Sequence, residues 1–256
     1  MSSLQQSRFG PWVLLLSAVV LGAALVIGTL ITTQSIDYIK TFNTSLLNVT
    51  GEAQMNVTSD DVKWTSQFFV NAQPTGLQPA YAEMTKDEAA VTAFLKAQNI
   101  PDGDVTIAPV QMNQIFANCA QDPAACKFNI GGYRLSQTVT VESSDVQGIT
   151  KVAQHTQPLI DDGVQFSTQS LDYYYTKLDT LRAKLLAQAT SEAQQRAKEI
   201  AAATGRQIGQ LVSVQEEPLQ LTPVNSPNVS NGGQYDTSTI QKQLTAIVQA
   251  AFRLPQ

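Results

Sequence analysis

The chain has very little of the residue types on which most enzyme sites depend. Its 256 residues include one histidine, His155, and two cysteines. A histidine-rich metal site is therefore excluded, and any Ser-His-Asp triad would have to use His155. That histidine stands in ITKVAQHTQPLI at helical spacing from Val152 and Leu159. We interpret it as a structural residue at the edge of a packed helix face.

Positive charge is also scarce. Lys and Arg number 16 against 21 Asp and Glu, and no run of basic residues is longer than a pair. A nucleic-acid-binding face needs clustered positive charge to neutralise phosphates, so we expect no nucleic-acid partner. Apolar residues make up 43% of the chain. This share is enough to bury a core, which indicates a folded protein.

Motifs for phosphate or acyl chemistry are missing as well. Gly131 and Gly132 precede a strand-like run without the G-x-G-x-x-G pattern, and no G-x-S-x-G elbow occurs. Three pairs of carboxylates stand at predicted turns: Asp60 with Asp61, Asp102 with Asp104, and Asp161 with Asp162. Aspartate is favoured at turns because its side chain caps backbone N–H groups. We expect no catalytic, metal-binding or cofactor-binding residues and no cofactor; an enzyme that uses one aspartate pair is the alternative.

One long apolar run is present near the N-terminus. Residues 9–34 carry no charged side chain, and PWVLLLSAVVLGAALVIGTLI covers residues 11–31. A helix of this length, rising about 1.5 Å per residue, spans roughly 30 Å and matches the hydrocarbon core of a bilayer. We predict a transmembrane signal anchor over residues 11–33. A cleaved signal peptide is the alternative, but its apolar stretch is only about 7–15 residues and ends at a small-x-small site.

The charges on either side of this run predict its orientation. Arg8 precedes the apolar run, whereas Asp37 comes before Lys40 after it. The positive-inside rule then makes residues 1–10 a short cytoplasmic N-terminus, residues 34–45 a linker and residues 46–256 an extracytoplasmic domain. We therefore expect a single-pass membrane protein with most of its chain outside the cytoplasm.

The two cysteines stand close together in the chain. Cys119 and Cys126 belong to CAQDPAAC, a turn-rich stretch between two strand-like runs. In an oxidising compartment we predict that they form a short-range disulfide, with two free thiols as the alternative. Their spacing is not that of a CxxC redox or zinc site.

Alternation and helical periodicity together predict an α+β fold. The first series has strands at residues 45–57 and 62–73, a helix at 79–98, and strands at 105–116 and 133–143. The second has a helix at 144–161 capped by Ser144 or Asp145, a strand at 163–171, a long helix at 174–204, and strands at 207–217 and 240–254. Residues 218–239, rich in Pro, Asn, Ser and Gly, predict a long mobile loop.

The long helix has a regular stripe of small residues. Leu181 and Leu185 are followed at every fourth position by Ala189, Ala193, Ala197 and Ala201. Residues four apart lie near one face of a helix, so the second half can approach a sheet or another helix closely. Gly205 stands where a left-handed C-terminal cap is usual. We interpret this face as a packing surface and do not expect it to bind a cofactor.

Several segments match a known family in order and spacing. They are NVTGEAQMNVTSDDV, NIPDGDVTI, GGYRLSQTVTVESSDV, GVQFSTQSL and the alanine helix that ends ATGRQIGQLVSV. Over residues 46–254 the chain resembles the SIMPL domain proteins of bacterial cell envelopes, a group that includes a periplasmic immunogenic protein. Ser59 replaces a usual proline and Asn99 a usual glycine, and the cysteine loop is not a general family feature. These departures concern turns and not the fold.

The resemblance implies an α+β domain in which strand-helix units form sheets backed by long helices. It also implies a tendency to form ring-like oligomers, and the family has no established catalytic residues. We therefore expect a non-enzymatic homo-oligomeric scaffold or interaction module, anchored in the bacterial inner membrane with its domain in the periplasm or outside the cell. Envelope proteins are its expected partners and stress tolerance its expected context. The alternative is a small-molecule or lipid-binding module that uses the groove between sheet and long helix.

Overall fold

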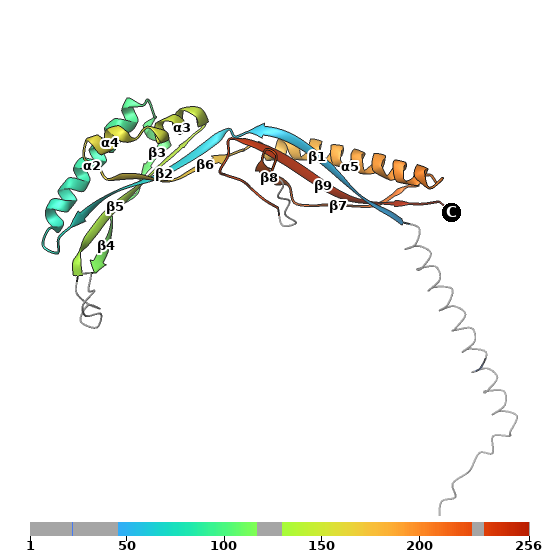
Figure 1. Cartoon of the computed structure of the whole chain (residues 1–256), viewed down its shortest axis with the longest axis horizontal. Coiled ribbons are helices and arrows are strands. Elements are labelled where there is room, and N and C mark those ends of the chain that lie inside the picture. Colours follow the sequence, from blue (N-terminus) through green and yellow to red (C-terminus); the bar gives the residue numbers. More distant parts are fainter. Residues whose placement is uncertain (1–21, 23–45, 117–129, 227–232, 256) are drawn as a thin grey trace, which may run out of the picture. The chain divides into compact units, whose positions relative to one another are not determined.

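The computed structural model describes residues 22, 46–116, 130–226 and 233–255 (Figure 1). Apart from Gly22, the predicted membrane anchor and linker lie outside the described residues, as do Cys119 and Cys126. Among the helices in these ranges, none is both long enough and apolar enough to span a bilayer.

The described chain forms an α+β fold with two sheets (Figure 1). Its strands are β1 (Leu46–Thr58), β2 (Asp61–Ala72), β3 (Val105–Ile107), β4 (Gln111–Phe116), β5 (Ile130–Ser143), β6 (Phe166–Tyr174), β7 (Leu211–Glu216), β8 (Gln220–Pro223) and β9 (Gln241–Arg253). Its helices are α2 (Leu77–Ala97), the short 3-10 helix η1 (Asp102–Asp104), α3 (Val146–Gln154), α4 (Gln157–Asp161) and α5 (Leu178–Ala203). The α+β class predicted from the sequence is confirmed.

The sheets are antiparallel and differ in strand order. One has the order β3-β5-β2-β6, with β4 also paired to β5, and its strand pairs are all antiparallel. The other has the order β1-β9-β7, with β8 also paired to β9. In the first sheet β3 and β4 therefore lie along one edge and β6 along the other, and in the second β1 lies along one edge and β7 and β8 along the other.

The chain divides into two compact units. Among the described residues, 46–51, 190–215 and 248–255 belong to the small unit, and 52–116, 130–189, 216–226 and 233–247 belong to the large unit. The strands β1 and β9 and the helix α5 each contribute residues to both units.

The core of the large unit is built from bulky side chains. The strand β2 alternates, with Val62, Trp64 and Phe68 fully buried, because successive side chains of a strand point to opposite faces. Met84, Val91 and Leu95 of α2 belong to the same core, together with Leu135, Val139 and Val141 of β5. Figure 1 shows α2, α3 and α4 on one face of this sheet.

Proline explains two places where a predicted element is divided. The predicted strand at 105–116 is two strands, β3 and β4, separated at residues 108–110, where Pro109 has no N–H to donate. The predicted helix at 144–161 is α3 and α4, and Pro158 lies in the first turn of α4. As predicted, Asp145 caps the first helix: its Oδ1 accepts a hydrogen bond from the Gly148 N–H at 2.9 Å.

Two other predictions are wrong. The predicted loop at 218–239 contains the strand β8, which pairs with β9, and a parallel bridge joins Leu221 to Tyr235. His155 is exposed rather than at the edge of a packed face. It follows the last residue of α3, and its Nδ1 lies 2.7 Å from the carbonyl oxygen of Lys151.

The alanine stripe of α5 is buried. Ala189, Ala193 and Ala197 are fully buried and Ala201 is 1% exposed. In the small unit, Ala193 and Ala197 form one apolar cluster with Val49 of β1 and with Ala250 and Phe252 of β9. The methyl side chains let the helix backbone lie close to the sheet.

The end of α5 has the geometry expected of a glycine cap. Gly205 has φ of +69°, in the left-handed region that glycine adopts without a Cβ penalty. The Arg206 N–H donates to the Ala201 carbonyl at 2.9 Å, and the Gly205 N–H donates to the Ala202 carbonyl at 3.0 Å. This pair of bonds is a Schellman motif, which satisfies the last carbonyls of the helix.

Candidate functional site

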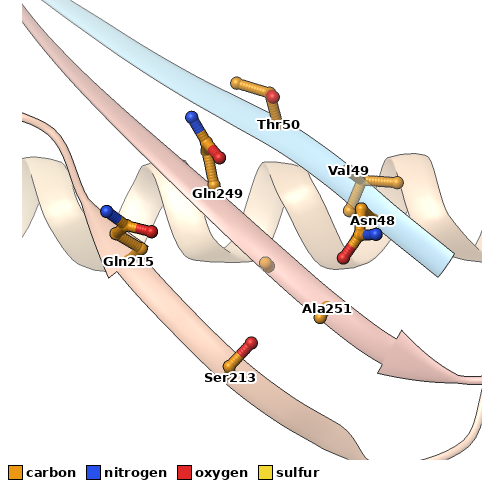
Figure 2. Close-up of a pocket in the computed structure, with 8 residues that line it drawn as sticks. Asn48, Val49, Thr50, Ser213, Gln215, Gln249 and Ala251 are labelled. Atoms are coloured by element: carbon orange, nitrogen blue, oxygen red, sulfur yellow. The ribbon is translucent and has the colours of Figure 1, made fainter. Parts of the chain in front are cut away.

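A shallow polar groove lies on the open face of the sheet in the small unit. Figure 2 shows α5 behind the sheet and the groove residues in front of it. The groove has a volume of about 200 Å³. Its lining comes from three strands: Asn48, Val49 and Thr50 of β1, Gln249, Ala250 and Ala251 of β9, and Ser213 and Gln215 of β7.

Strand alternation accounts for this polar face. Val49 is buried towards α5, whereas its neighbours Asn48 and Thr50 are exposed. One solvated face is typical of antiparallel sheets. The lining therefore offers amide and hydroxyl groups for hydrogen bonding, but it has neither a charged side chain nor a nucleophile beside a general base.

A second groove lies on the helix side of the same sheet. It has a volume of about 430 Å³, within the range of small-molecule sites. It is lined by Thr190, Ser191 and Gln194 of α5, by Gly209, Gln210 and Leu211, and by Phe252. The sequence predicted a groove between sheet and long helix but not these residues.

Gly209 allows the chain to enter β7 close to β9. A Cβ at this position would lie 2.8 Å from the carbonyl oxygen of Arg253, too close for any side chain. The Gly209 N–H instead donates to that oxygen at 2.6 Å, and the Arg253 N–H donates to the Gln210 carbonyl at 3.0 Å. The glycine thus fixes where β7 joins the sheet.

The strand β7 is an exposed, largely apolar edge. All six of its residues are exposed, and the exposed fractions of Leu211, Val212 and Val214 are 45%, 42% and 47%. Among the described strands β7 pairs with β9 alone. Residues 211–215 contain neither a charged residue nor a proline, the usual protections of an edge strand.

The opposite edge of this sheet is different, because a charged side chain covers part of β1. The Arg196 guanidinium of α5 donates through Nη1 to the carbonyl oxygen of Thr50 at 2.6 Å. It also forms an ion pair with Glu192 one turn earlier on α5. A main-chain acceptor of β1 is therefore engaged by a charged group.

The large unit has an exposed apolar edge of its own. The strand β4 pairs only with β5 among the described strands, and all its residues are exposed. Met112, Ile115 and Phe116 are its large apolar side chains, and Phe116 is 57% exposed. Large exposed apolar groups that gather on one strand are typical of interaction surfaces.

The aspartate pairs have structural partners. Asp60 accepts hydrogen bonds from the Thr176 N–H at 2.8 Å and the Thr176 hydroxyl at 3.1 Å, and it pairs with Lys177. Burial raises the pKa of Asp60, but the hydrogen bonds from Thr176 and Lys177 outweigh it and lower the pKa. Asp102 pairs with Lys96, and Asp161 accepts a hydrogen bond from Gln157. These contacts are structural, but they are not the local turn caps predicted: the Thr176 N–H that Asp60 accepts from lies 116 positions along the chain, and Asp102 and Asp161 contact side chains.

A buried ion pair in the large unit was not foreseen from the sequence. Lys242 of β9 is fully buried, and its Nζ lies 2.9 Å from Asp236 Oδ2 and 2.6 Å from the Asp236 carbonyl oxygen. The Asp236 carboxylate also accepts hydrogen bonds from the backbone N–H and hydroxyl of Ser238 and Thr239. Burial raises the pKa of Asp236, but the hydrogen bonds from Thr239, Ser238 and Lys242 together lower it well below its usual range.

The sequence indicated one part of this cluster, the turn closed by the Asp236 side chain, but not the burial of Lys242. An aspartate followed by Ser and Thr, as in YDTST, is typical of a turn closed by the aspartate side chain. The alternation of IQKQLT places Lys242 on the same face as Ile240 and Leu244, but lysine is almost never fully buried without a partner, so its burial was not predicted. Within the described residues, no group of three or more His, Cys, Asp and Glu side chains could hold a metal ion.

The comparisons with known proteins identify the family. The model of the SIMPL family, described as a protein of unknown function (DUF541), matches residues 47–252. The chain therefore belongs to the SIMPL family, and the resemblance found in its sequence is confirmed. No curated protein matches this chain.

The similarity to a solved structure is distant. An amidase of the hydantoinase/carbamoylase family from Burkholderia phymatum is 10% identical, with a TM-score of 0.26. The match covers 54% of this chain and 35% of the amidase chain. A similarity at this level carries no argument about this protein.

Proposed function

We propose that this SIMPL protein is a non-enzymatic interaction module of the bacterial cell envelope that assembles into homo-oligomers. The observation that carries the proposal is the exposed strand β7, where Leu211, Val212 and Val214 lie in a stretch, residues 211–215, without a charged residue. An open strand edge offers a row of backbone hydrogen-bonding groups to another chain, and apolar side chains add burial. The exposed apolar edge β4 supports a second contact, with another envelope protein.

The proposal places the module outside the cytoplasm on a membrane anchor at residues 11–33. The uncharged apolar run at residues 11–31 and the order of the flanking charges support this placement. N-terminal sequencing of the protein from purified inner membranes tests it. An intact N-terminus in the membrane fraction is expected, and a mature chain trimmed after residue 31 would contradict the anchor.

Mass measurement tests assembly directly. The full chain, extracted in a mild detergent, should give a protein mass of two or more times the 27.7 kDa of one chain, measured by light scattering corrected for bound detergent. Chemical crosslinking in intact membranes should give the same multiple, which rules out an effect of extraction. A strictly monomeric protein in both measurements would contradict the proposed function.

A second candidate function is small-molecule or lipid binding in the groove between α5 and β7. Its volume of about 430 Å³ and its mixed lining of hydroxyl, amide and apolar groups favour this candidate. Native mass spectrometry of the purified protein would show a retained ligand. Ser191→Trp should fill the groove and release it, whereas Gln195→Trp, on the exposed face of α5, should not.

A further inference from the structure

We propose that two copies of this chain join through their β7 strands, which pair antiparallel about a two-fold axis centred on Ser213. This inference rests on the proposed assembly function and names its contact. The pairing would continue the sheet of one small unit into that of a second copy. Such an interface is isologous, because the same surface serves both copies.

The edge of β7 is suited to strand addition. An edge strand directs every second N–H and C=O away from its own sheet, and those groups are available to a new strand. Residues 211–215 have no charge and no proline to oppose this. The Val212 and Val214 side chains, each more than 40% exposed, would become covered by the second copy.

The second copy is expected to bring its own β7 rather than its β1. The β1 edge already has the Arg196 guanidinium on the Thr50 carbonyl, held in place by Glu192. Strand addition at that edge would have to displace a charge-assisted hydrogen bond. On β7 the charged contact is at its end, where Arg182 of α5 pairs with Glu216, and the side chains of residues 211–215 are uncharged.

The positions of the two valines select the register. When Ser213 of one copy lies opposite Ser213 of the other, Val212 of each copy lies opposite Val214 of the other. Directly opposite β-branched residues have Cβ atoms about 4.5–5.5 Å apart and stabilise an antiparallel pair. A centre on Val212 would place Val214 opposite Gln210, and a centre on Val214 would place Val212 opposite Glu216. The centre on Ser213 is the one of these three that matches both valines.

This symmetry also determines which faces of the two small-unit sheets lie on the same side of the combined sheet. A two-fold axis perpendicular to the sheet leaves each face on the same side. Both α5 helices would therefore cover one face of the continued sheet. The uncharged groove around Asn48, Gln249 and Gln215 would stay open on the other face of each copy.

Cysteine crosslinking tests the register. In the full chain, Ser213→Cys should form an intermolecular disulfide under mild oxidation, since the two Cβ atoms face each other across the axis. Gln215→Cys is the matched control on the same strand and face. Its two copies would lie four residues apart, roughly 13 Å along the strand, and should not crosslink. The wild-type chain, which keeps Cys119 and Cys126, gives the background in every gel.

A charge introduced on the β7 edge tests the β7 contact independently of the crosslinking. Val214→Lys should lower the assembly mass at least twofold, because two lysines cannot be buried beside the facing valines. Asn48→Lys, on the other edge of the same sheet, should leave the mass unchanged. Circular dichroism checks that each variant is folded, and if Val214→Lys is unfolded, the two cysteine variants decide.

The outcomes separate this inference from the proposed function. Crosslinking of Ser213→Cys but not of Gln215→Cys, with loss of mass in Val214→Lys, supports both. A wild-type oligomer without crosslinking at Ser213→Cys and without loss of mass in Val214→Lys overturns the β7 contact and leaves the proposed function standing. A monomeric wild-type chain overturns both.

Discussion

The strands β6 and β7 are both edges of a sheet, but only β6 is covered. On β6, the Tyr173 N–H donates to the Thr237 carbonyl at 2.8 Å, and the Thr237 hydroxyl donates to Asp172 at 3.0 Å. The covering segment is anchored by Asp236 and the buried Lys242. The edge of β7 has no charged residue between Leu211 and Gln215 and remains exposed. The covered edge thus has an anchored segment beside it, whereas residues 211–215 of β7 are exposed.

The helices that cover the two sheets also differ, in the size of the side chains that they pack against the sheet. On the large-unit sheet, α2 packs with Met84, Val91 and Leu95, which are bulky. In the small unit, α5 packs with Ala193 and Ala197. Bulky side chains fill a thick core, whereas alanine brings the helix near to the sheet and covers less of it. Substitutions on α2 and α5 can test whether the stability of the two packing arrangements responds differently to a change in side-chain volume.

The largest effect is expected at the anchor of the covered edge. Asp236→Ala leaves the ammonium of Lys242 buried without its partner, so the free energy of unfolding should fall by about 3–5 kcal/mol. Glu142→Ala, which breaks the exposed pair with Lys63, should cost less than about 1 kcal/mol. Urea denaturation of the full chain measures both. Equal losses would show that the covering segment does not depend on its buried ion pair.

The same anchor predicts a dependence on pH. The pKa of Asp236 is lower in the folded state than its unfolded value of about 3.9, so its contribution to stability is complete only above about pH 5. Stability should be lost as the pH falls below that value, because the carboxylate must then be protonated. Between about pH 5 and pH 3, the free energy of unfolding measured by urea denaturation should fall less steeply with acid for Asp236→Asn than for the wild type.

The next effect concerns the bulky core under α2. Leu95→Ala removes a side chain that is 2% exposed and should lower the free energy of unfolding by about 2–5 kcal/mol through the cavity it leaves. The neighbouring Lys96→Ala, on the exposed face, is the control. A loss no greater than that of the control would mean that this core closes around the missing side chain.

The alanine face of α5 should respond to added volume instead. Ala197→Leu should cost about 1–3 kcal/mol, because the fully buried methyl group leaves no room for a larger side chain. Ala202→Leu introduces the same side chain on the exposed side of the helix and should be nearly neutral. Similar stabilities of the two variants would show that α5 is not held close to the sheet.

The smallest effects are expected at the ends of the two helices. Both end in a left-handed residue, Asn99 with φ of +60° after α2 and Gly205 with φ of +69° after α5. Asn99→Gly should raise the free energy of unfolding and Gly205→Asn should lower it, each by less than about 1 kcal/mol. Thermal denaturation of the two variants gives the signs, and the same sign for both would contradict this account.

Local patterns were enough to predict most of the fold. The alternation of β1, β2 and β9 and the periodicity of α2 and α5 depend only on neighbours in the chain. The strand β8 was missed because its Pro- and Asn-rich surroundings have the composition of a loop, and its pairing with β9 is a tertiary contact. Asn99, where the family usually has glycine, was expected to affect only a turn, and the structure places it at the end of α2.

The candidate site was less predictable than the fold. The buried alanine face of α5 and the existence of a groove beside it follow from helical spacing. The exposure of β7 does not follow from any local pattern. The segment QLVSVQ has the composition of an internal strand, and only the strand order makes it an edge. The Arg196 bond to Thr50 joins residues 146 positions apart, a separation that no local pattern reports.

The uncharged, valine-bearing edge of β7 has a thermal consequence. Association through apolar surface weakens on cooling and responds little to ionic strength, unlike association through charged groups. Samples held on ice should therefore contain less of the assembled form than samples at room temperature, and a high-salt wash should not dissociate it. The proposed β7 contact would then loosen on cooling without any chemical signal.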